Sequence, residues 1–284
     1  MPKLEIYQSL WAMELRRPDG KEHSLERKFE MIVEAGYKGV CIDLGSGDMD
    51  AAHKASPLIR KHKLGCLLNA FPRTIEDLRP VLRFAKEHNS QFVNLIDQMM
   101  PISVDGMIAV IRERMAMGRA EGMPIVYETH RNCLTNDLFD TLRLVDAIPD
   151  LLLCGDLSHF LVDREFRYPL SEADHKLMYR ILDRCESFQG RVASREQVQV
   201  QITFPQHQKW FDVFAHWWEY GMREWLKRHG ENDTLIFLCE LGPPEYAITG
   251  KDGYELSDRW EEALIIRKRV EGIWDKLLAE RKRA

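Results

Sequence analysis

Eight short β-rich runs alternate with eight longer stretches of helical periodicity along this chain of 284 residues. The expected strands are 4–10, 38–44, 64–70, 91–97, 124–130, 151–157, 187–193 and 235–241. The expected helices are 24–35, 48–62, 74–88, 103–121, 136–147, 172–185, 208–229 and 258–281. Strands that alternate with helices in this way form a parallel sheet covered by helices.

The number of units favours a closed barrel over an open sheet. Each strand and its helix take about 35 residues, and eight such units fit a single (β/α)8 TIM barrel, whose usual length is about 250 residues. An open doubly wound sheet is the alternative. It is disfavoured because no glycine-rich turn follows the first strand and because an eighth strand is present to close the sheet. No linker divides the chain, so we expect one domain over residues 1–284.

Two of the expected helices carry recognisable end signals. Ser24 precedes the apolar stripe of the first helix and Gly36 follows it, which predicts an N-cap and a left-handed C-terminal residue. Thr74 and Asp77 have the spacing of a capping pair, which predicts that the third helix begins at residue 74.

The charge and hydropathy of the chain exclude two classes of partner. A net charge of −5 and a pI near 6.1 argue against nucleic acid, whose binders carry a basic stripe that neutralises phosphates. No apolar run approaches the roughly 18 residues that span a membrane, and no signal-like segment begins the sequence. We therefore expect a cytoplasmic protein with neither nucleic acid nor membrane as a partner.

Oxygen-bearing side chains stand at the ends of the last four expected strands. They are Glu128 in IVYETH, Asp156 in LLLCGDLSH, Gln189 in SFQGRV and Glu240 in LIFLCELGPP. In a barrel of this kind the C-terminal ends of the strands carry the active site. Each residue taken alone is more easily explained as a helix cap or a turn residue. Asp43 and Asp97, which end the second and fourth strands, are interpreted in that way.

Glu128, Asp156 and Glu240 differ from such turn residues because they lie inside apolar runs, where burial is expected. An isolated buried carboxylate is costly, so each needs a partner. A divalent metal is such a partner, and carboxylate and carboxamide oxygens suit a hard ion such as Mn²⁺ or Mg²⁺.

The order of these residues resembles that of the xylose isomerase-like TIM barrel superfamily, in particular its sugar phosphate isomerase/epimerase group. The resemblance covers nearly the whole chain and includes the Asp-x-x-His motif Asp156-Leu-Ser-His159 at strand six. It implies one essential divalent metal, Mn²⁺ or Mg²⁺ before Co²⁺ or Zn²⁺, held by Glu128, Asp156, Gln189 and Glu240. It also implies that Glu128 and Glu240 act as acid and base. His207, in FPQHQ, is the alternative to Gln189.

Three further side chains are expected to bind substrate. His159 matches a substrate-contacting histidine of the superfamily, with a role in orienting Asp156 as the alternative. Arg191 lies two residues after Gln189 and hence on the same face of the strand. His130 follows Glu128 at the same interval and is expected to serve as a second acid or base, to bind a hydroxyl, or to cap the next loop.

The implied function is a metal-dependent isomerase or epimerase of a sugar, a sugar phosphate or a hydroxy-keto acid. Its reaction would transfer a proton through a metal-stabilised enediolate. A lyase of the C-glycoside deglycosidase type and a non-catalytic barrel subunit are the alternatives. An apurinic-site endonuclease is disfavoured, because the chain has neither a histidine-rich multi-zinc set nor a basic groove. The expected partner is a small carbohydrate-like substrate, and a homo-oligomer is an open alternative to a monomer.

Overall fold

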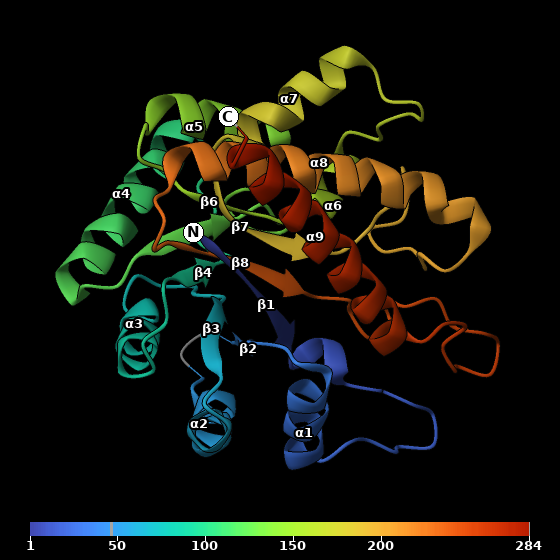
Figure 1. Cartoon of the computed structure of the whole chain (residues 1–284). Helices are drawn as coiled ribbons and strands as arrows, with labels where there is room; N and C mark the ends of the chain where they lie inside the picture. The colour runs from blue at the N-terminus through green and yellow to red at the C-terminus, as the bar shows by residue number, and fades with distance from the viewer. Residues whose placement is uncertain (46–47, 284) are drawn as a thin grey trace.

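The computed structural model describes residues 1–45 and 48–283, and within these ranges the chain forms a closed barrel of eight parallel strands surrounded by helices (Figure 1). The strands are β1 (Lys3–Ser9), β2 (Gly39–Leu44), β3 (Gly65–Ala70), β4 (Val93–Leu95), β5 (Ile125–Glu128), β6 (Leu153–Gly155), β7 (Cys185–Gly190) and β8 (Thr234–Cys239). The α-helices are α1 (Leu25–Ala35), α2 (Asp50–His62), α3 (Leu78–Glu87), α4 (Val104–Glu121), α5 (Leu138–Ala147), α6 (Leu157–Asp163), α7 (Glu172–Leu182), α8 (Gln208–Arg228) and α9 (Arg259–Arg281). Two short 3₁₀ helices are η1 (Trp11–Met13) and η2 (Pro205–His207).

Hydrogen bonds between the first and last strands close the sheet. β1 runs parallel to β8 and pairs with it from Lys3 opposite Thr234 to Gln8 opposite Cys239. Every other strand pairs with its successor in the chain. The prediction of a (β/α)8 barrel is therefore confirmed, and the open doubly wound sheet is wrong. The prediction of one domain over residues 1–284 extends to residues 46, 47 and 284, which lie outside the described residues, and it stays a prediction.

The ends of α1 follow the sequence signals, whereas the start of α3 does not. The Ser24 hydroxyl accepts a hydrogen bond from the Arg27 amide at 3.2 Å, and Gly36 ends α1 with a left-handed φ of 83°. Helix α3 begins at Leu78 rather than at residue 74. The Asp77 carboxylate accepts the Thr74 amide at 2.9 Å, and this contact forms a turn that precedes the helix. The predicted cap of α3 is wrong for that reason.

Strand β6 is shorter than the expected strand 151–157 because a helix begins directly after it. The Asp156 carboxylate accepts the Ser158 amide at 3.1 Å and so caps the N-terminus of α6. Helix α6 was not predicted from the sequence. It carries His159, whose ring lies beside His130 and Asp156.

The helices pack on the barrel through large aromatic side chains, most of all in α8. Trp217, Trp218 and Trp225 of α8 are fully buried. The ring of Trp218 lies 5.3 Å from that of Phe237 in β8, and Trp225 lies 6.0 Å from Trp274 in α9. Burial of each such side chain stabilises the fold by about 2 kcal/mol. No helix in the described part of the chain is long and apolar enough to cross a membrane.

The two segments that follow β7 and β8 are joined at the C-terminal end of the barrel. The Gln199 side chain donates to the Gly242 carbonyl at 2.9 Å and accepts the Gly242 amide at 2.7 Å. Both groups are buried. This paired contact ties the two segments together above the strand ends, where the candidate site lies.

Candidate active site

Strand alternation sorts the side chains inside the barrel into layers. The barrel interior is filled by an apolar cluster of Tyr7, Cys41, Leu67, Phe92, Val126, Cys154, Ile236 and Leu238. A side chain two residues further along a strand points to the same side of the sheet. By this rule seven strands each supply one polar side chain above the cluster, and Gln189 takes the corresponding place on β7, two residues beyond the buried Ser187. We call these eight residues the mouth layer: Ser9, Asp43, Asn69, Asn94, Glu128, Asp156, Gln189 and Glu240. The four predicted metal ligands all belong to it.

Glu128 is the last residue of β5, and its carboxylate is enclosed by amides. Its Oε2 accepts hydrogen bonds from the side chains of Asn94 and Gln189. Burial raises the pKa of Glu128 well above its ordinary value, and the negative charge of Asp156 raises it further. Its surroundings therefore favour the protonated form of Glu128 more than water does.

Asp156 has the opposite electrostatic environment, although it is equally buried. Its Oδ1 accepts from Ser158, while its Oδ2 lies 3.0 Å from Arg191 Nε and 3.3 Å from His159 Nε2. Burial acts against the charge, but the Arg191 guanidinium and His159 outweigh it and hold the pKa of Asp156 well below its ordinary value. The charged form of Asp156 is therefore favoured, and both its oxygens are engaged by neighbouring side chains.

Glu240 follows β8 directly and lies on the other side of Arg191. The Arg191 Nη2 is 3.6 Å from Glu240 Oε1. Burial raises the pKa of Glu240 well above its ordinary value, and the negative charge of Glu128 adds to this effect. Glu240 Oε2 and Arg191 Nη1 are buried and find no hydrogen-bond partner among the described residues.

Gln189, for which the sequence left His207 as an alternative ligand, points its amide at Glu128. Its Nε2 donates to Glu128 Oε2, and its Oε1 is buried with no partner in the described ranges. The alternative ligand His207 ends η2, and its Nδ1 lies 2.8 Å from the Gln201 carbonyl oxygen.

His130 and His159 lie next to one another above Glu128. Their ring centroids are 4.0 Å apart, and one ligand atom from each of Glu128, His130 and His159 falls within 4.8 Å of the others. Burial lowers the pKa of His130 to about 3, with a further contribution from His159. Burial also lowers the pKa of His159. Both imidazoles are therefore neutral at physiological pH, the state in which histidine binds metals.

Four members of the mouth layer, Ser9, Asp43, Asn69 and Asn94, were not predicted as site residues. Asn69 and Asn94 are fully buried, with Asn94 Nδ2 2.9 Å from Asn69 Oδ1. Asp43 was interpreted as a turn acid, but its carboxylate oxygens are buried, and burial raises its pKa to about 6 against the effect of the neighbouring Asn69 amide. Each lies two residues beyond an apolar residue of a predicted strand, and this spacing was the signal in the sequence that identifies them.

Two aromatic rings pack against the guanidinium of Arg191. The guanidinium carbon of Arg191 lies 4.7 Å from the ring centroid of Tyr246 and 5.7 Å from that of Trp11. The two rings meet edge to face at 5.3 Å. Trp11 therefore lies against the mouth of the barrel. Contacts of a guanidinium with aromatic faces hold its plane in a fixed orientation.

The charges and unpaired atoms of the mouth layer fit a divalent cation. Four carboxyl groups gather there, and Arg191 is the guanidinium that contacts two of them. The unpartnered buried oxygens of Gln189 and Glu240 are donors that such an ion accepts. Burial without a partner is costly for each of these atoms, and coordination removes that cost.

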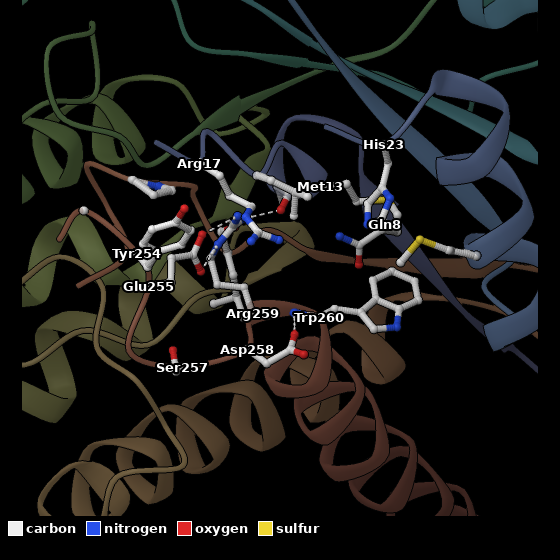
Figure 2. Close-up of a pocket in the computed structure, with 16 residues that line it drawn as sticks. Gln8, Met13, Arg17, His23, Tyr254, Glu255, Ser257, Asp258, Arg259 and Trp260 are labelled. Atoms are coloured by element: carbon white, nitrogen blue, oxygen red, sulfur yellow. Dashed lines mark hydrogen bonds and ion pairs between the residues drawn. The ribbon is translucent and has the colours of Figure 1, made fainter. Parts of the chain in front are cut away.

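A cavity lies beside η1, away from the mouth layer (Figure 2). It has a volume of about 350 Å³, and its walls come from β1, η1, the segment after β8 and the start of α9. Gln8, which alternates with the inward-facing Tyr7, points into it beside His23 and Trp260 (Figure 2). Arg259 forms another wall and donates to the backbone carbonyls of Leu241 at 3.1 Å and Glu14 at 2.6 Å. Of the described residues that line this cavity, none belongs to the mouth layer.

Comparison with other proteins identifies the fold. No protein-family model matches the chain, and no curated protein matches its sequence. A xylose isomerase-like TIM barrel protein from Mycobacterium smegmatis, solved in complex with magnesium, is 11% identical, with a TM-score of 0.61 over 96% of this chain and 97% of that one. The D-allulose 3-epimerase from Methylomonas sp., solved with D-allulose, is 13% identical, with a TM-score of 0.61 over 96% and 98% of the two chains.

A third solved structure extends the same likeness. An L-ribulose 3-epimerase is 13% identical, with a TM-score of 0.62 over 99% of this chain and 97% of that one. At these identities the agreement concerns the path of the backbone over almost the full length of both chains. The chain therefore has the xylose isomerase-like TIM barrel fold, as its sequence predicts.

Proposed function

We propose that this chain is a sugar isomerase or epimerase that transfers a proton between its two buried glutamates and the substrate. The observation that carries the proposal is the pair Glu128 and Glu240, both in the mouth layer and both with a pKa raised by burial and by a neighbouring carboxylate. A group whose pKa is moved toward neutrality can both take and return a proton. The epimerases of the same fold give the proposal its substrate class.

The charged and aromatic groups around the glutamates suit a polyhydroxylated substrate. Arg191 Nη1 has no partner among the described residues and is able to donate to a carbonyl or hydroxyl oxygen. Trp11 and Tyr246 offer flat apolar surface beside it for the C–H face of a sugar. His130 and His159 have two roles open to them in this proposal, contact with the substrate and contact with a metal.

The proposal includes one divalent metal at the mouth. Glu128 would hold it together with other donors. If these donors are Asp156, Gln189 and Glu240, the ion would be Mn²⁺ or Mg²⁺. The alternative donors are the two histidines. When bound, the metal would polarise the substrate carbonyl and offset the charge that develops on its oxygen. The chain's own part is to remove and return the C–H proton through Glu128 and Glu240.

The test is exchange of solvent deuterium into substrate. The full chain, supplied with Mn²⁺, is incubated in D₂O with a panel of ketoses, their phosphates and hydroxy-keto acids, and incorporation at the carbon next to the carbonyl is followed by NMR. We expect incorporation with at least one sugar, and a loss of at least about 100-fold in Glu128→Gln and in Glu240→Gln. Glu196→Gln, an exposed glutamate after β7, is the matched control and keeps the full rate.

Wild-type protein that incorporates no deuterium from any member of the panel would contradict the proposal. Rates that survive both glutamine substitutions would remove the two glutamates from proton transfer. No described contact favours the lyase or the non-catalytic subunit over an isomerase. A cytoplasmic location and assembly into a homo-oligomer stay predictions from the sequence.

A further inference from the structure

The mouth already contains one cation, the guanidinium of Arg191. Its Nε lies 3.0 Å from Asp156 Oδ2 and its Nη2 lies 3.6 Å from Glu240 Oε1, with Arg191 only 1% exposed. An arginine side chain does not lose its proton in proteins, so this positive charge is permanent. Two of the four carboxylate and amide ligands predicted from the sequence are therefore paired with a fixed positive charge, which would repel a divalent ion placed between them.

Asp156 is further removed from a ligand role by its other contacts. Its Oδ1 accepts the Ser158 amide and hydroxyl, and its Oδ2 is shared by Arg191 and His159. A metal that used either oxygen would break the cap of α6 or the pair with Arg191. Asp156 is instead suited to orient the His159 ring, in the way that a carboxylate orients a metal-binding histidine from behind.

Each of the two histidines has at least one ring nitrogen left for a ligand. His159 Nε2 lies 3.3 Å from Asp156 Oδ2, and neither of its ring nitrogens, both buried, has a hydrogen-bond partner in the described part of the chain. His130 Nδ1 contacts the Arg131 carbonyl oxygen, which leaves Nε2 as its second nitrogen. An oxygen acceptor on one ring nitrogen fixes the tautomer and directs the other nitrogen, the usual arrangement for histidine in a metal site.

We propose that Glu128, His130 and His159 hold the divalent metal. The guanidinium of Arg191 occupies the position between Asp156 and Glu240 that the metal would take in the four-ligand set. The ligand atoms of the three residues already lie within 4.8 Å of one another. One carboxylate and two imidazoles form a nitrogen-rich set that prefers Zn²⁺, Co²⁺, Mn²⁺ or Fe²⁺ to Mg²⁺. Three protein ligands leave positions open for two adjacent oxygens of a substrate, and Glu240 is left free for proton transfer.

The inference rests on the proposed function for the presence of a metal at this mouth, and it names the ligands. X-ray absorption of the wild-type full chain loaded with one equivalent of Co²⁺ tests it without any substitution. We expect scattering from two imidazoles in the cobalt spectrum. A spectrum with no imidazole, or a chain that binds neither Co²⁺ nor Zn²⁺ in titration calorimetry, overturns the inference.

Variants supply the second measurement. His130→Ala and His159→Ala are each expected to weaken Co²⁺ binding more than about 100-fold, since a ligand matters at least as much as the residues that orient it. Gln189→Ala and Glu240→Gln, which alter the other predicted ligands, are expected to change it less than threefold. The opposite pattern would overturn the assignment in favour of the four-ligand set. Metal binding through the histidines with no deuterium exchange into any sugar would leave this site standing and reject the proposed isomerase.

Discussion

Asp97, two residues beyond β4, and Arg114 of α4 form a two-pronged ion pair from which solvent is fully excluded. Arg114 Nε lies 2.8 Å from Asp97 Oδ2 and Nη2 lies 3.1 Å from Oδ1, and both side chains are 0% exposed. The remaining guanidinium nitrogen donates to the carbonyls of Thr74 at 2.9 Å and Ile75 at 2.7 Å. Asp97 Oδ1 also accepts the Met99 amide at 3.0 Å, as expected of a turn acid, so Asp97 both shapes this turn and anchors α4.

Removing one partner of this pair is expected to destabilise the fold strongly. Arg114→Met leaves a buried carboxylate without its counter-charge, which costs about 3–5 kcal/mol of the free energy of unfolding. Urea unfolding measures the loss. Arg112→Met, an exposed arginine of the same helix, is the control and changes stability by less than about 0.5 kcal/mol. Equal effects of the two substitutions would show that the ion pair is not an anchor.

The ring of Tyr7 fills the barrel interior against two strands that have glycine at the contact. A Cβ at Gly65 would overlap Tyr7 Oη and lie 2.5 Å from its Cζ, and a Cβ at Gly39 would also lie 2.5 Å from Cζ. Gly65→Ala is therefore expected to lower the free energy of unfolding by about 1–3 kcal/mol. In a Tyr7→Leu background, Gly65→Ala should lower the free energy of unfolding by less than it does in the wild-type chain. Additive losses would contradict the clash.

Gly272 offers a control of opposite sign. It is an exposed glycine within α9, and a Cβ there would meet nothing within 4 Å. Gly272→Ala is expected to stabilise the chain by up to about 1 kcal/mol, because alanine loses less backbone entropy than glycine in a helix. A thermal melt of both glycine variants separates steric overlap from helix propensity.

Asp43 makes stability depend on pH. Burial raises the pKa of Asp43 to about 6, above its value in the unfolded chain, so its contribution is complete below about pH 4 and is lost as the pH rises through 6. Two pKa units correspond to at most about 3 kcal/mol. We expect the stability of Asp43→Asn relative to wild type, measured by urea unfolding in EDTA, to increase from pH 4 to pH 7. A pH-independent difference would contradict the raised pKa.

Helix α7 begins with a reciprocal cap that is expected to contribute measurably to stability. The Ser171 hydroxyl accepts the Asp174 amide at 3.1 Å, and the Asp174 carboxylate accepts the Ser171 amide at 3.2 Å. Ser171→Ala should lower the free energy of unfolding by about 1 kcal/mol, and Ser171→Gly should lower it by only a few tenths of a kcal/mol. A glycine variant as unstable as the alanine variant would argue against the cap as the cause.

The barrel was predictable because its signals are local. Hydrophobic periodicity and helix caps such as Ser24 with Gly36 depend on residues close in the sequence. The mouth layer follows the same logic, since Asn69 and Asn94 occur at the strand interval that also places Glu128. The start of α6 was not predicted. There the Asp156 carboxylate accepts hydrogen bonds from the amide and hydroxyl of Ser158, and a helix begins where the strand was expected to continue.

What the sequence did not predict is which charges pair with one another. Arg191 was recognised as a residue of the site, but its contacts with Asp156 and Glu240 join segments that are far apart in the chain. The pairing of Asp97 with Arg114 arises in the same way, from a helix that folds back over a strand end. Such contacts depend on the packed structure, and no pattern along the chain fixes them.

Asp156 is both the N-cap of α6 and a member of the mouth layer. Its carboxylate caps α6, and His159 lies within the first turn of that helix. Anything that binds His159 at the mouth therefore also favours the helical form of the segment that carries it. By reciprocity, a solution condition that frays this segment must weaken binding by the same free energy, so local order and ligand capture are thermodynamically linked here.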